Sequence, residues 1–176
     1  MLTNYKNICL AVDPGYGRLG LAVIAYEGQH VSLLHSECVE TPASLPFGAR
    51  LQAAAEQFEH LIKKFSPQHV AFESLFFSKN TTTALKVAEL RGALIYLCAT
   101  HNIEICEYNP SEIKVAVTGY GKSGKAGIAT MVQRLLGPSF KPKKKMLDDE
   151  IDAIAIGLTH AACFPQLTAR RNLLQK

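Results

Sequence analysis

The order of its apolar segments constrains the fold of this chain more than any other feature. Three segments of strand length come first, and helical segments then alternate with two more strands. The predicted strands cover residues 7–13, 20–25, 31–39, 69–73 and 103–108. The predicted helices cover residues 45–65, 81–101, 111–117, 124–136 and 147–163. This order predicts an α/β fold in which a five-stranded mixed sheet, with its first three strands antiparallel, is flanked by helices.

The length of 176 residues suits one domain, which we place at residues 1–165, followed by a flexible tail over 166–176. The five cysteines are scattered and never in a CxxC spacing, which indicates reduced thiols in a cytoplasmic protein. The N-terminal residues lack the plan of a signal peptide, and no apolar run reaches the length of a membrane span. We therefore expect no membrane partner.

Positive charge gathers in one region of the chain. Residues 110–147 hold eight lysines and arginines against the single acid Glu112, although the whole chain has a net charge of only +4. Basic clusters neutralise phosphates, so a polyanion is the expected partner of this region. For the run from Lys141 to Lys145 alone, DNA binding and a merely solvated loop remain equally open.

Acidic residues occur where the fold would bring them together. Asp13 ends the first strand and Glu73 ends the fourth, and sites in open α/β sheets form at strand ends. Asp149 and Asp152 are three residues apart on the last helix and share one face, with Asp148 as an alternative to Asp149. Glu150 should point elsewhere.

Clustered carboxylates repel one another unless cations bind between them. Oxygen ligands without a Cys or His cluster suit Mg²⁺ or Mn²⁺, and two such ions can support phosphodiester hydrolysis. Taken singly, Asp13 can be a turn former before Pro14, and Asp148 and Asp149 can be partners of a helix dipole. Glu73 and Asp152 are harder to explain structurally, because both lie among apolar residues.

Two further segments carry possible contacts to nucleic acid. Residues 119–126 match GxxxxGK, but Ala126 replaces the Ser or Thr that a P-loop needs for Mg²⁺, so a turn that faces a phosphate is the better interpretation. Phe76 and Phe77 follow Glu73, and an aromatic ring there can stack on a base. We assign this role to Phe76 and a packing role to Phe77.

Together these residues resemble the RuvC family of bacterial Holliday junction resolvases. The resemblance runs nearly the full length of the chain. The residues that carry it are 11–15 with Gly20, 72–76, 80–86, 91–92, 107–108, 113–114, 117–119 with Gly121, and 149–155. Leu19 departs from the pattern, because many members have Thr there.

The resemblance implies a ribonuclease H-like fold and a homodimer that makes paired symmetric nicks in four-way DNA junctions with two Mg²⁺ per site, Mn²⁺ substituting. It implies that the nicks leave 5′-phosphate and 3′-hydroxyl ends, and that the RuvA and RuvB branch-migration complex is a partner. The family carboxylates carry over onto Asp13, Glu73, Asp149 and Asp152. The DNA contacts carry over onto Phe76, Lys114 and Lys125, and Lys79 and Lys122 are further candidates.

Two other classes of function remain open. A YqgF-like enzyme of the same fold acting on RNA would share Asp13 and Asp152 but would not need Phe76 or the lysine-rich region. A non-catalytic junction-binding module would keep the basic region and need no set of carboxylates. We also infer that the apolar helix 81–101 forms the dimer surface.

Overall fold

The computed structural model describes residues 6–74, 81–138, 140, 142 and 146–174. The strands are β1 (Asn7–Pro14), β2 (Arg18–Glu27), β3 (His30–Glu40), β4 (His69–Glu73) and β5 (Glu104–Tyr108). The helices are α1 (Phe47–Phe65), α2 (Thr81–Thr100), α3 (Pro110–Thr118), α4 (Lys125–Leu136) and α5 (Asp148–Leu174). Over the residues described, no helix combines the length and the apolar character needed to cross a membrane.

The strands form one mixed sheet in the order β3-β2-β1-β4-β5. β1 and β3 are antiparallel to β2, whereas β4 is parallel to both β1 and β5. The predicted five-stranded mixed sheet with an antiparallel start is therefore confirmed. The order places β1 and β4 side by side in the centre, with the ends of both strands at the same edge.

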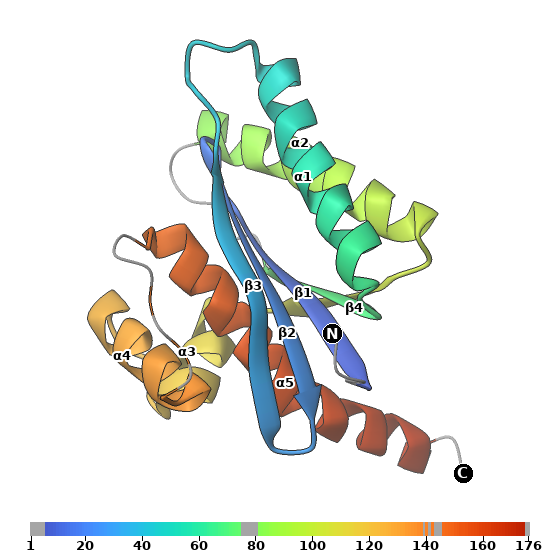
Figure 1. Ribbon diagram of the computed structural model, residues 1–176, viewed down its shortest axis with the longest axis vertical. Coiled ribbons are helices and arrows are strands. Elements are labelled where there is room, and N and C mark those ends of the chain that lie inside the picture. Colours follow the sequence, from blue (N-terminus) through green and yellow to red (C-terminus); the bar gives the residue numbers. More distant parts are fainter. Residues whose placement is uncertain (1–5, 75–80, 139, 141, 143–145, 175–176) are drawn as a thin grey trace.

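Helices cover both faces of the sheet, as Figure 1 shows. α1 and α2 pack on one face, where Leu10, Val12 and Phe72 belong to a core shared with Phe58 and Leu94. On the other face α3, α4 and α5 pack against a second core, and α5 lies directly along β1 and β2. Strands buried on both sides explain why the sequence of β1 is a nearly continuous apolar run.

Local signals set several helix ends. Ser66 adopts a left-handed conformation with φ 48° and ends α1 just before Pro67. α3 begins with a capping box, in which the Asn109 side chain accepts from the Glu112 N–H and the Glu112 carboxylate accepts from the Asn109 N–H. Gly119, with φ 73°, ends α3. These caps define both ends of α3, directly before the basic turn.

α5 is longer than predicted. The expected end was Cys163, but the helix continues to Leu174, through Pro165. A proline removes one intrahelical hydrogen bond and bends a helix, yet the Gln, Leu, Ala and Arg residues after it are good helix formers. The backbone of the segment predicted as a tail is therefore helical to Leu174, and its flexibility stays a prediction.

A polar network lies inside the second core. His160 of α5 is fully buried, and its two ring nitrogens lie 3.0 Å from the hydroxyls of Tyr26 on β2 and Tyr108 on β5. Burial lowers the pKa of His160 to about 3, so the ring is neutral, with one nitrogen donating and the other accepting. Both of its hydrogen-bonding sites are used.

Candidate active site

The structure brings the two strand-end acids together. β1 and β4 pair in parallel up to Val12 and Phe72, and the next residues are Asp13 and Glu73. Both side chains are partly buried at the same edge of the sheet. The Glu73 carboxylate is close enough to raise the pKa of Asp13 by its charge. The predicted proximity of Asp13 and Glu73 thus follows from the parallel pairing of β1 with β4.

The first turn of α5 places two more acids at this edge. It lies against Gly20, which faces Asp13 across the β1–β2 ladder. A Cβ atom at Gly20 would overlap the backbone oxygen of Asp149 and lie 2.6 Å from its carbonyl carbon. Only glycine allows this approach, and it brings the carboxylates of Asp149 and Asp152 near Asp13.

The neighbouring acids of α5 have other partners, although the charge of Asp148 also raises the pKa of Asp152. Asp148 is exposed and accepts a 3.0 Å hydrogen bond from Lys125. Glu150 is buried against β3, where it accepts a 2.7 Å hydrogen bond from Ser36. Asp149, unlike Asp148, contributes to the raised pKa of Asp13. The geometry therefore favours Asp149 as the fourth member of the site.

Burial and mutual repulsion perturb these carboxyls. Burial is the largest cause that raises the pKa of Asp13 to about 7, followed by the charges of Asp152, Glu73 and Asp149. Burial, then the Asp152 charge, raises the pKa of Glu73, and burial also raises that of Asp152. Such an arrangement is costly when all four groups are ionised, and a bound cation would relieve the cost.

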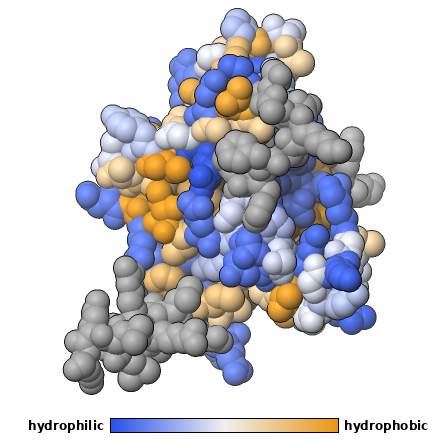
Figure 2. All heavy atoms as spheres, turned by 180° about the vertical axis from the view of Figure 1, so that it is seen from behind, coloured by the Kyte–Doolittle hydropathy of each residue, from blue (hydrophilic) through white to orange (hydrophobic). Residues whose placement is uncertain are grey.

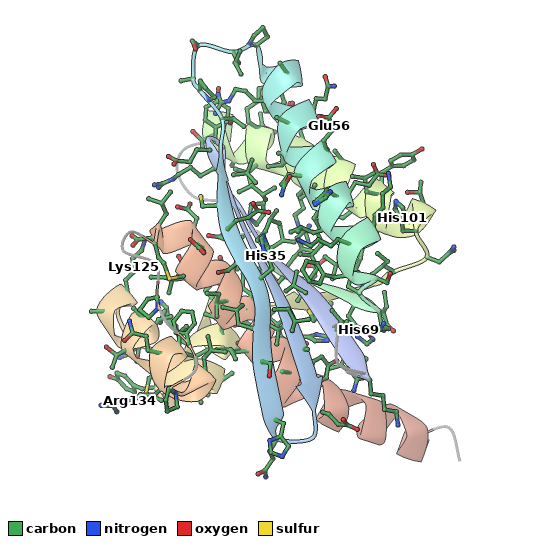
Figure 3. The ribbon with its side chains drawn as sticks, in the orientation of Figure 1. His35, Glu56, His69, His101, Lys125 and Arg134 are labelled. Carbon is green, nitrogen blue, oxygen red and sulfur yellow. The ribbon has the colours of Figure 1, made fainter. Side chains whose placement is uncertain are left out.

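Two predicted lysines lie beside the acids. Lys114 of α3 lowers the pKa of Glu73 and Asp152 by its charge, and Lys125 of α4 does the same for Asp13 and Asp152. Lys125 stands at the start of α4, next to the first turn of α5 (Figure 3). Lys125, Ala126, Ala129, Asp148, Ile151 and Asp152 line an open pocket of about 140 Å³. Lys122 is exposed in the preceding turn. Four other predictions fall outside the described residues, namely those on Phe76, Phe77, Lys79 and the lysines of the run Lys141–Lys145.

Two arginines near the site were missed by the sequence reasoning. Arg18 of β2 lies with its Nε 3.1 Å from Oδ2 of Asp149. Arg50 of α1 is only 4% exposed and anchors the loop after Asp13, donating to the Tyr16 carbonyl at 2.7 Å and to Thr41 Oγ1 at 3.1 Å. Arg50 lies four residues before the buried Ala54, so its position on the apolar stripe of α1 was the available signal.

The residue types suit a divalent cation. In the part of the chain that the structure describes, no three His, Cys, Asp or Glu side chains already form a metal-binding group. The four carboxylates nevertheless supply only hard oxygen donors. Burial and mutual repulsion raise the pKa values of Asp13, Glu73 and Asp152, and a cation between these groups would relieve the repulsion. The donor set therefore fits Mg²⁺ or Mn²⁺.

Comparisons with known proteins identify relatives of this chain. Residues 9–160 match the family described as "Crossover junction endodeoxyribonuclease RuvC". A protein of that name from Thermotoga maritima is 43% identical over 162 residues, which cover 92% of this chain and 93% of the relative. One from Brachyspira hyodysenteriae is 40% identical over 155 residues, covering 88% and 94% of the two chains.

A solved structure described as Thermus thermophilus RuvC in complex with Holliday junction substrate is similar over nearly the whole chain. Its TM-score is 0.83 with 31% identity, and the match covers 92% of this chain and 97% of that one. The yeast mitochondrial Holliday junction resolvase Ydc2 shares the fold, with a TM-score of 0.67 and 16% identity. On the strength of the matched family and its relatives, this chain belongs to the RuvC family of crossover junction endodeoxyribonucleases.

Proposed function

We propose that Asp13, Glu73, Asp149 and Asp152 form the active site with which this chain resolves Holliday junctions. As a RuvC-family protein, the chain is a metal-dependent endonuclease that cuts four-way DNA junctions. The observation that carries the choice of site is the convergence of four carboxylates from β1, β4 and α5 on one edge of the sheet, with the pKa of Asp13 raised to about 7. Carboxylates perturbed in this way mark a functional site more often than a structural one.

In this proposal the four carboxylates would hold two Mg²⁺ ions, and Mn²⁺ would serve in place of Mg²⁺. When bound by these residues, such ions would activate a water for attack on the scissile phosphate and stabilise the departing 3′-oxygen, so that cleavage would leave 5′-phosphate and 3′-hydroxyl ends. Lys114 and Lys125 offset the negative charge of the DNA phosphates beside the acids, since their charges already act on Glu73, Asp13 and Asp152. Lys122 and Lys79 extend these contacts along the strand, and Phe76 contacts a base at the junction centre.

Paired nicks in a symmetric junction require two sites related by a two-fold axis, so we propose a homodimer. Its surface is α2, where Leu85 and Tyr96 are 60% and 67% exposed. Figure 2 shows an apolar patch on the side of the molecule that carries the C-terminal half of α2. We also propose that the enzyme acts in the cytoplasm on junctions moved by the RuvA and RuvB complex.

Replacing Leu85 and Tyr96 together with glutamate should break the dimer, because two charges would enter an apolar interface. Sedimentation velocity should then show a monomer, and junction cleavage should give uncoupled single nicks. Leu135→Glu on α4, which changes a 48% exposed leucine, is the matched control and should leave the dimer intact. A stable dimer of the double variant would move the interface away from α2.

A gel assay on a synthetic, branch-mobile four-way junction tests the function itself. We expect paired symmetric nicks with Mg²⁺ or Mn²⁺ and none with EDTA, and no comparable cleavage of a linear duplex or of RNA. Tight junction binding without nicks, across several sequences and with both metals, would instead support a non-catalytic binding module. Preferential cleavage of RNA would support the YqgF-like alternative.

A further inference from the structure

Asp149 forms an ion pair with Arg18 of β2. The Nε of Arg18 lies 3.1 Å from Oδ2 of Asp149, and the two side chains are 47% and 18% exposed. The other oxygen, Oδ1, lies 3.7 Å from the place where a Cβ of Gly15 would stand, close to the loop that follows Asp13. One oxygen of Asp149 thus faces Arg18, while the other lies beside Gly15 in the loop that follows Asp13.

The charges of Arg18 and Asp149 both act on the neighbouring thiol of Cys38. Next to them on β3, the pKa of Cys38 is raised to about 11 by burial and then by Asp149, and it is lowered in turn by Arg18. The side chain of Arg18 is half exposed and can move into water, whereas Oδ2 of Asp149 is buried and makes no hydrogen bond to the residues that the structure describes, so this oxygen is available to another cation once Arg18 leaves. An ion pair of this kind is weak, so a divalent cation can displace it.

We propose that Arg18 is an internal counter-ion that competes with the metal for Asp149 and so sets the affinity of the site for divalent cations. This inference rests on the proposed function, in which Asp149 is a metal ligand. Without metal, Arg18 reduces the repulsion between Asp149 and the other three carboxylates. When metal binds, Arg18 gives up the Asp149 carboxylate, and part of the binding free energy is spent on breaking this pair.

The test compares Arg18→Met with the full-length protein in the absence of DNA. Methionine keeps much of the aliphatic packing and removes the charge. Titration of Mn²⁺, followed by electron paramagnetic resonance of the free ion, should show about 3- to 5-fold tighter binding in the variant. Lys63→Met, which removes the exposed pair with Glu59 on α1, is the matched control and should bind Mn²⁺ unchanged.

Thermal unfolding in EDTA separates competition for Asp149 from a general change in charge. Arg18→Met should lower the Tm by about 2–4 °C, because Asp149 loses its counter-ion. In an Asp149→Asn background the same change should leave the Tm unaltered, because there is no carboxylate for Arg18 to hold. A fall in Tm of equal size in both backgrounds would overturn the proposal, since Arg18 would then be purely structural.

The outcomes distinguish this proposal from the proposed site. If the unchanged protein binds Mn²⁺ and Arg18→Met binds it with the same affinity, the competition is wrong and the active site stands. If the unchanged protein binds no Mn²⁺, or if Asp149→Asn binds it equally well, the assignment of Asp149 as a ligand fails, and the competition fails with it.

Discussion

Asp13→Asn should bind four-way junctions as tightly as the unchanged protein and cut them ~10³-fold more slowly, a loss of ~4 kcal/mol of transition-state stabilisation. Asp13 lies at the centre of the site, where its carboxylate interacts with those of Asp152, Glu73 and Asp149. The amide has nearly the same shape but is a poor ligand for a divalent cation. Gel shifts in EDTA measure binding, and single-turnover cleavage in Mg²⁺ measures the rate.

The same variant should also be more stable than the unchanged protein without metal at high pH. The pKa of Asp13 rises from 3.8 to about 7 on folding, so the folded chain keeps a proton that the unfolded chain has lost. Stability from this group is therefore present below pH 3.8 and is lost as the pH rises through about 7. Asparagine cannot ionise and escapes this loss, so at pH 8 we expect a gain of roughly 1–3 kcal/mol.

Thermal unfolding in EDTA at pH 5 and pH 8 checks the expected stability. The difference between Asp13→Asn and the unchanged protein should be larger at pH 8. Glu56→Gln is the control, because Glu56 is an acid on the outer side of α1, far from the site (Figure 3). Unimpaired cleavage by Asp13→Asn would refute the carboxylate site, whatever the stability shows.

Among the glycines, Gly20 leaves the least room for an added methyl group, so Gly20→Ala should be strongly damaging. The new Cβ would overlap the backbone of Asp149, which cannot move aside as a side chain could. The first turn of α5 must then shift away from β2, and Asp149 and Asp152 move with it. We expect a loss of at least ~1–3 kcal/mol of stability and a fall in cleavage rate of ~10²-fold, since small misplacements of reacting groups are costly.

Gly48→Ala provides the matched control, since a Cβ at Gly48 in α1 meets no atom within 4 Å. This variant should unfold at the same temperature or slightly higher, because alanine favours the helix. Urea unfolding and single-turnover cleavage of both variants give the comparison. If Gly20→Ala retained full activity, the close packing of α5 on β2 could not be what positions the acids.

The sequence predicted the fold and the convergence of acids from β1, β4 and α5 because both depend on local patterns. Strand ends are readable from apolar runs, and the three-residue spacing of Asp149 and Asp152 defines a helix face. It could not decide between Asp148 and Asp149, because that choice depends on the axial rotation of α5 against Gly20. Glu150 was predicted to point elsewhere, and its hydrogen bond to Ser36 confirms this.

The contacts of Arg18 and Arg50 could not be predicted in the same way. Each joins residues that are distant in the chain, and the pairing depends on how β2, α1 and α5 meet in space. The continuation of α5 beyond Pro165 was missed because a proline usually ends a helix, whereas here good helix formers follow it. The roles of Phe76 and Lys79 stay predictions, because both residues lie outside the part of the chain that is described.

The hydrogen bonds of His160, in the middle of α5, have a consequence for the acids in the first turn of the helix. A helix that met the sheet through small apolar residues alone could slide along it at little cost. Tyr26 and Tyr108, on β2 and β5, each bond one nitrogen of the same ring, so any slide of α5 would strand two hydroxyls and an imidazole in the core. Eleven residues separate Asp149 from His160, about 16 Å of helix. The hydrogen bonds of His160, in the middle of α5, thus fix how far Asp149 and Asp152 reach into the site.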